Sequence, residues 1–344
     1  MNNLLYELIQ VGLGTRDVLS RAPSAAEWDG LYREAQRQCV VALLVDGLER
    51  LAAEQRPPQQ LLMQWIGQMQ IVEANYALQF NRAKELTALF AEKGYRSCVL
   101  KGVGFAQLYD NPARRQCGDI DLWVDGDRKE VMPWLKGQYS VEHVVWHHVD
   151  ASLYDDVHTE IHFYPCWMYN PYFNRRLQRW FESQKEAQMA KIDSELGFAR
   201  SSARFNAVYS LVHTYHHLIE EGVGLRHIID YYYIVRSLPD IERTAVVADL
   251  KRLGLLRLAS AMMCVLEEVC GMAQELLLCT PDEKEGLFLL DEVMRGGNFG
   301  HHRTDNRRRN TAGRMFALLP HYPREVLWVV PWKLWHKCWR FLHS

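Results

Sequence analysis

The sequence predicts an α+β fold, with a small core of mixed sheet and helices between two helical regions. Two observations predict it. Apolar residues recur at steps of three or four through both ends of the 344-residue chain, which is the period of a buried helix face. Helix and strand patterns alternate only between about residues 85 and 165. The expected segments are an N-terminal helical region at 1–84, the core at 85–165 and a C-terminal helical region at 166–344.

The N-terminal region carries helix start and stop patterns. Ser24 stands three residues before Glu27 and ahead of an apolar stripe, which is the pattern of a capping box. The stretch 59–93 contains no proline and has one apolar face, so one long helix is expected there. Gly94 follows it, and glycine is the residue with which helices commonly end.

The core and the C-terminal region differ in their apolar period. In the core, short β-rich stretches bounded by turn residues predict strands at 95–100, 120–124, 141–149 and 157–164, with helices at 105–109 and 128–135. Beyond residue 171 the helical period returns, and helices are expected at 205–221, 226–237, 241–253, 256–271 and 328–342.

Charge and cysteine content narrow the class of protein. Lys and Arg total 40 and Asp and Glu total 42, so a net charge of −2 gives no global attraction for nucleic acid. No apolar run of about 18 residues appears, so no spanning helix is expected. The eight cysteines form no CxxC pair and stand in apolar contexts, which favours reduced thiols in a cytoplasmic protein.

A strand with two carboxylates carries the clearest chemical pattern. Alternation along it places Asp119 and Asp121 on one face and Ile120 with Leu122 on the other. Two carboxylates this close repel each other unless a cation lies between them, and Mg²⁺ prefers oxygen ligands. An acidic strand end facing solvent is the alternative that this motif alone leaves open.

A second strand offers a third carboxylate. The same alternation places His158, Glu160 and His162 on one polar face. Together with Asp119 and Asp121, Glu160 can complete a site for two metal ions, one activating a hydroxyl and the other neutralising a triphosphate. The expected cofactor is Mg²⁺, as two ions, with Mn²⁺ as the alternative.

A glycine turn precedes the carboxylate strand. Lys101 and Gly102 follow a predicted strand end, and Arg115 stands shortly before Asp119. Glycine lets backbone N–H groups approach phosphate oxygens, and Lys and Arg bind the same oxygens. A plain tight turn explains the glycine alone, but the succession of turn, basic residue and carboxylate strands favours a phosphate site.

These motifs resemble a known family. Leu100-Lys101-Gly102, then Arg115 and then Gly118-Asp119-Ile120-Asp121-Leu122, resembles a family of uncharacterised nucleotidyltransferases within the polymerase-β-like superfamily. The resemblance is closest over 85–165 and continues more loosely to Leu225-Arg226-His227-Ile228-Ile229-Asp230. It implies a polymerase-β-like core that transfers a nucleoside monophosphate from an NTP to a hydroxyl and releases pyrophosphate.

The resemblance also implies site residues. Asp119 and Asp121 match the metal-binding pair, Glu160 matches a third carboxylate that is usually Asp, and His162 matches a histidine after it. The superfamily's usual Gly-Ser turn is Gly102-Val103 here, so a serine is missing. Lys101, Arg115 or backbone amides at Gly102 are then expected to hold the triphosphate. The implied acceptor is a sugar, a tRNA or a protein.

Two other functions stay open. The missing serine and Glu160 fit a catalytically inactive relative that binds nucleotide or serves as a scaffold. An arginine cluster at 303–309 fits a toxin-like transferase that modifies tRNA or protein, although most charge runs are solvated loops.

Three further patterns each have two readings. His213 and His217, four apart on a predicted helix, suit zinc or, more simply, a hydrogen-bonded interior. Arg226 and Asp230 suit either an ion pair along a helix or a nucleotide pocket. The terminal helix carries tryptophans that suit docking on the protein itself or peripheral membrane contact, namely Trp328, Trp332, Trp335 and Trp339.

Overall fold

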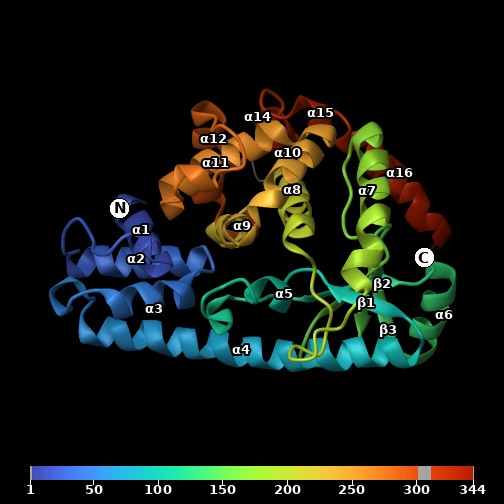
Figure 1. The fold of residues 1–344 in the computed structure, drawn as a ribbon, viewed down its shortest axis with the longest axis horizontal. Coiled ribbons are helices and arrows are strands. Elements are labelled where there is room, and N and C mark those ends of the chain that lie inside the picture. Colours follow the sequence, from blue (N-terminus) through green and yellow to red (C-terminus); the bar gives the residue numbers. More distant parts are fainter. Residues whose placement is uncertain (1, 301–310, 344) are drawn as a thin grey trace.

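The computed structural model describes residues 2–300 and 311–343 and has the predicted α+β architecture (Figure 1). A five-stranded mixed sheet is flanked by helices. The arginine cluster at 303–309 lies outside the described residues, so the interpretation built on it stays a prediction. No helix in the described part of the chain is long and apolar enough to cross a membrane. All eight cysteines are unpaired.

Most helices form two groups along the chain, one before and one after the segment that builds the sheet. The first group is α1 (Asn2–Leu13), α2 (Ala25–Arg37), α3 (Val41–Arg50) and α4 (Gln59–Glu92). The sheet segment holds β1 (Arg96–Val99), α5 (Val103–Ala106), β2 (Ile120–Asp125), α6 (Arg128–Gln138), β3 (Ser140–Val144), β4 (His148–Ser152) and β5 (Thr159–His162). The last group is α7 (Pro171–Met189), α8 (Ala203–Glu220), α9 (Leu225–Ser237), α10 (Asp240–Arg252), α11 (Leu256–Cys270), α12 (Glu283–Gly296), α14 (Thr311–Leu318), α15 (Pro323–Val326) and α16 (Val329–His343).

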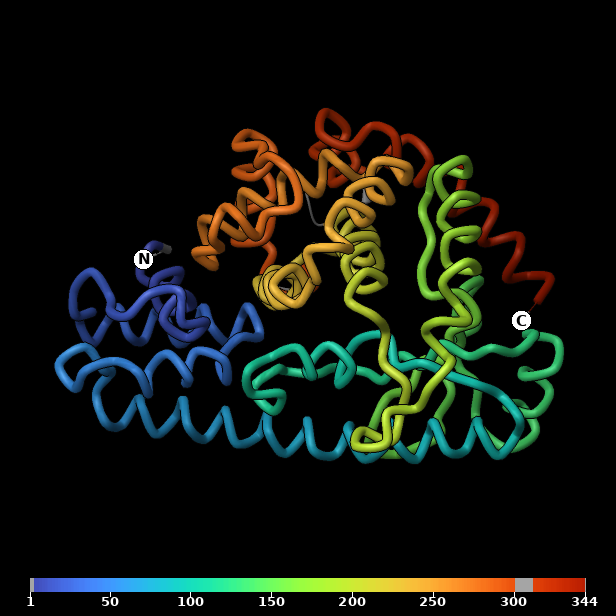
Figure 2. Tube along the Cα trace, viewed as in Figure 1, coloured from blue at the N-terminus to red at the C-terminus, as the bar shows by residue number. Residues whose placement is uncertain are grey.

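The long helix α4 passes beneath both the N-terminal helices and the sheet (Figures 1 and 2). Its first half buries Leu61 and Trp65 in the helical core, and its second half buries Leu86 and Phe90 against the sheet. It ends where expected, since Gly94 has a φ of 83°. The boundary predicted between residues 84 and 85 falls inside α4, and the division into three domains stays a prediction.

Sheet register decides which side chains face the cavity described below. The strand order is β1-β2-β5-β4-β3, and β2 and β5 are parallel with Asp121 opposite Glu160. Alternation sends Ile120 and Leu122 into a core shared with α4 and α6, as predicted. The opposite face carries Asp121 and also Trp123, whose ring stacks on Phe205 of α8 at 5.6 Å.

The prediction of a single strand at 141–149 is wrong. The chain forms a hairpin there, with β3 antiparallel to β4, and Val145 N donates to His148 O at 3.1 Å. The turn contains no Gly, Pro, Asn or Asp, so the sequence pattern gave no sign of it. As a consequence, β4 places His148 opposite His162 at the centre of the sheet.

A buried ion pair joins the sheet segment to α9. Arg115 donates to both carboxylate oxygens of Asp230, each at 2.7 Å, and Tyr109 donates to the same carboxylate at 2.7 Å. Both members of the pair are about 95% buried. Removing one partner would leave the other charge buried without compensation, which costs far more than losing an exposed pair.

We therefore expect Asp230→Asn to lower the free energy of unfolding by about 3–5 kcal/mol, measured by urea denaturation. The matched control is Asp110→Asn, which breaks the more exposed Arg236–Asp110 pair and should cost about 0–1 kcal/mol. Equal losses in the two variants would contradict a structural role for the Arg115–Asp230 pair.

A second buried carboxylate links α15 to the start of α7. Glu325 is 2% exposed, and its Oε2 accepts hydrogen bonds from the backbone N–H groups of Tyr169 and Asn170. Burial raises the pKa of Glu325 to about 7, since desolvation outweighs these two bonds. A carboxyl with a raised folded-state pKa stabilises the fold at low pH, and this contribution disappears as pH rises through 7.

The prediction is that wild-type stability falls by on the order of 3 kcal/mol more than that of Glu325→Gln between pH 4 and pH 8. Denaturant unfolding of both proteins across that range measures it. Parallel pH profiles for the two proteins would show that the carboxyl titrates normally.

Candidate active site

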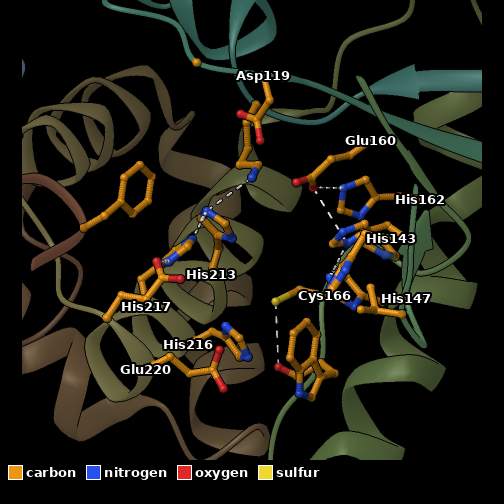
Figure 3. Close-up of a pocket in the computed structure, with 18 of the residues that line it drawn as sticks. Asp119, His143, His147, Glu160, His162, Cys166, His213, His216, His217 and Glu220 are labelled. Atoms are coloured by element: carbon orange, nitrogen blue, oxygen red, sulfur yellow. Dashed lines mark hydrogen bonds and ion pairs between the residues drawn. The ribbon is translucent and has the colours of Figure 1, made fainter. Parts of the chain in front are cut away.

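A cavity of about 850 Å³ lies between the Asp121 face of the sheet and the C-terminal helices. Figure 3 shows carboxylates of the sheet on one side and histidines of α8 on the other. The sheet and its loops contribute Lys101, Gly102, Arg115, Asp119, Glu160 and His162, whereas α8, α9 and α16 contribute His213, His217, Arg226, His227, Lys333 and Lys337. All the predicted site residues except Asp121 line this cavity directly.

Asp121 lies just beneath the cavity surface and is fully buried. Its Oδ1 is 2.8 Å from Lys101 Nζ and 3.0 Å from His162 Nε2. Although burial opposes ionisation, the Lys101 ammonium holds the pKa of Asp121 below its usual value. The solvent-facing alternative for this strand end therefore does not apply to Asp121.

Glu160 and His162 extend the same cluster along β5. His162 Nε2 is 3.1 Å from Glu160 Oε2, and His148 Nδ1 is 3.7 Å from the same oxygen. Burial alone would lower the pKa of His162, but its contacts with Asp121 and Glu160 raise it to about 9. Burial likewise opposes ionisation of Glu160, yet His162 lowers the pKa of that carboxyl to about 2. The carboxylates are thus held ionised by neighbouring cations.

The carboxylate oxygens of the cluster suit a hard divalent cation, whereas His162 Nε2, protonated at its raised pKa, donates to both of them. One ligand atom each from Asp121, Glu160 and His162 lie within 4.8 Å of one another. Asp121 Oδ2 is buried and has no hydrogen-bond partner among the described residues. Asp119 lies at the cavity edge, close enough to Lys101 and Glu160 to affect their pKa values. A buried carboxylate oxygen without a partner is what a cation would satisfy.

The predicted phosphate-binding residues are present but engaged. Lys101 is paired with Asp121, and the Nε–Nη2 edge of the Arg115 guanidinium contacts Asp230. Gly102 has a φ of 51°, and a Cβ there would lie 3.0 Å from Asp119 O, so the turn requires glycine. Their roles toward a triphosphate stay predictions.

Sequence reasoning missed a third histidine beside His213 and His217. His227, from the motif at the start of α9, brings one nitrogen within 4.8 Å of theirs. His148 on β4 was missed too, because the hairpin was not recognised. The spacing between α8 and α9 depends on helix packing, and only the family-like motif around Arg226 drew attention to that segment.

The tryptophans of α16 dock on the protein itself. Trp332 stacks on Trp167 with ring centroids 5.0 Å apart, and the Trp339 ring lies 5.1 Å from the Arg128 guanidinium. Trp335 of the same helix remains 47% exposed, and Trp328, which precedes the helix, is 41% exposed. The helix therefore has one docked face, which forms a wall of the cavity, and one face turned to solvent.

Comparison with known proteins supports the resemblance. A family model described as uncharacterised nucleotidyltransferase matches residues 24–271, which include the sheet and helices α2 to α11. Neither the curated proteins nor the solved structures that were compared gave a match. The matched region is well over half of the chain and contains the carboxylate and histidine walls of the cavity. The chain therefore belongs to the uncharacterised nucleotidyltransferase family.

Proposed function

We propose that this protein is an Mg²⁺-dependent nucleotidyltransferase that transfers a nucleoside monophosphate from an NTP to a hydroxyl acceptor. One observation carries the proposal. Asp121 and Glu160 are in register on parallel strands, with Asp119 at the cavity edge, and a buried Asp121 oxygen has no partner among the described residues. The cavity is large enough for a nucleotide and opens beside these carboxylates.

Asp119, Asp121 and Glu160 would hold Mg²⁺, or Mn²⁺ in its place. Such ions neutralise phosphate oxygens and lower the pKa of a bound hydroxyl. The acceptor oxygen attacks the α-phosphorus in line, the bond from that phosphorus to the bridging oxygen breaks, and pyrophosphate leaves. Glu160 would accept the hydroxyl proton and pass it to solvent.

His162 and Lys101 would position these carboxylates. His162 contacts both Asp121 and Glu160, so it fixes their separation, and Lys101 fixes the other side of Asp121. The same contacts support the alternative of an inactive relative, in which Lys101 and His162 permanently neutralise the carboxylates. That alternative allows nucleotide binding without metal dependence and without turnover.

Metal-dependent nucleotide binding separates the two functions. We expect each NTP that binds to require Mg²⁺ in calorimetric titration, and Asp119→Asn or Asp121→Asn to weaken that binding by at least tenfold. If an acceptor is found, turnover should fall on the order of 10²–10³-fold, corresponding to several kcal/mol of lost stabilisation. Asp155→Asn, at an exposed position outside the cavity, is the control. Binding that is indifferent to Mg²⁺ and to both aspartates favours the inactive relative.

We also propose that α16 makes peripheral contact with an anionic membrane surface. Leu334 and Leu342 on this helix are 63% and 75% exposed, and residues 327–343 contain basic but no acidic side chains. Exposed apolar side chains interleaved with Lys and Arg suit the interface of an anionic bilayer.

Sedimentation with lipid vesicles tests this contact. The wild type should bind vesicles containing phosphatidylserine, and bind them less as salt increases. The double variant Leu334→Ser/Leu342→Ser should lose most of the binding. Ile241→Ser removes an equally exposed apolar residue, 89% exposed on α10, and should not. If the wild type stays in the supernatant, α16 has no such role.

A further inference from the structure

Three histidines form the wall of the cavity opposite the carboxylates. His213 and His217 come from α8, and His227 comes from the first turn of α9. His217 Nε2 is 3.0 Å from His213 Nε2, which is 3.3 Å from Lys101 Nζ. We call this set, with Arg226 beside it, the imidazole wall.

The hydrogen bonds of the imidazole wall are unfavourable for a metal ion. The backbone N–H of Gly224 donates to His227 Nδ1 at 3.3 Å, so Nε2 of the neutral ring carries a proton and offers no lone pair. Because an ammonium can only donate, His213 Nε2 accepts from Lys101 and its lone pair is not free for a metal ion. Zinc would have to displace both interactions.

The same features favour an anion. Lys101 and Arg226 are cationic, and His227 offers an N–H toward the cavity. Arg226 Nε is buried without a hydrogen-bond partner among the described residues, although its Nη1 donates to Gln116 O at 3.0 Å. Burial and these cationic neighbours lower the pKa of His213 and of His227, so both rings are neutral at pH 7.

Two acidic groups near the wall are already engaged, while Asp119 also lines the cavity and acts on Lys101. Glu221 contacts His217 Nδ1 at 3.2 Å, whereas the other ring nitrogen of His217, Nε2, contacts His213. Asp121 is paired with Lys101 and His162. The ring of Phe299 lies 5.3 Å from the Arg226 guanidinium and 4.9 Å from the His217 ring centroid, which limits solvent on that side.

We propose that the imidazole wall binds a phosphate group of the substrate. The inference rests on the proposed function and adds the place in the cavity where the phosphate group of the substrate binds. The residues expected for that role are engaged, since Arg115 is held by Asp230 and the turn at Gly102-Val103 has no serine. Arg226, through its unpartnered Nε, and His227, through Nε2–H, supply donors across the cavity from the carboxylates. The group is either the β,γ-diphosphate of the NTP or a phosphate on the acceptor.

Pyrophosphate without metal is the probe. In calorimetric titration we expect the wild type to bind it, His227→Leu and Arg226→Gln each to weaken binding at least tenfold, and His158→Gln to leave it unchanged. His158 has a side chain that is 57% exposed and lies outside the cavity lining. Folding of each variant is checked by its denaturation midpoint. No pyrophosphate binding by the wild type, or equal binding by the folded variants, overturns the inference.

Competition then assigns the source of the phosphate. If the wall holds the nucleotide's diphosphate, pyrophosphate will compete with NTP and not with the corresponding nucleoside monophosphate. If it holds an acceptor phosphate, pyrophosphate and NTP will bind together. Mg²⁺-dependent NTP binding that needs Asp119 but not His227, with no pyrophosphate binding, would reject the inference and keep the proposed function. Pyrophosphate binding that needs His227, with NTP binding indifferent to Mg²⁺, would keep the inference and reject the proposed function.

Discussion

The buried carboxylate of Asp121 is the constraint around which the sheet and the cavity are arranged. A fully buried carboxylate costs several kcal/mol unless cations and hydrogen bonds compensate it. Here Lys101 and His162 do so, one from the chain end of β1 and the other from β5. The parallel pairing of β2 and β5 brings His162 and Glu160 to Asp121, whereas the antiparallel pairing of β1 and β2 brings Lys101. The contacts of Asp121 that stabilise the sheet are therefore the same ones that position the proposed metal-binding carboxylates.

Features set by local periodicity could be predicted from the sequence. The capping box at Ser24, the long helix through residue 92 and the alternating faces of β2 are present as expected. Contacts that depend on packing between distant segments could not be predicted. Lys101 meets His213 across 112 positions and Arg115 meets Asp230 across 115, and no local pattern encodes such separations. The hairpin at 140–152 was missed for a different reason, since its turn lacks the usual turn residues.

The walls of the cavity differ in how they relate to the family. The carboxylate and imidazole walls lie within the matched residues 24–271, whereas α16 lies beyond them. Lys333, Lys337 and Trp332 of α16 nonetheless line the cavity. The family match therefore describes the side on which nucleotide chemistry is proposed. The basic, aromatic side belongs to a part of the chain that the family model does not describe.

The continuity of α4 has a mechanical consequence. Its 34 residues span about 51 Å at 1.5 Å per residue, with one end packed among the N-terminal helices and the other under the sheet. A rigid rod of that length amplifies rotation, so a tilt of about 5° at one end displaces the other by about 4 Å. Any partner that reorients α1 to α3 would therefore tilt α4. The far end of α4 would then move β1 and the Lys101 turn.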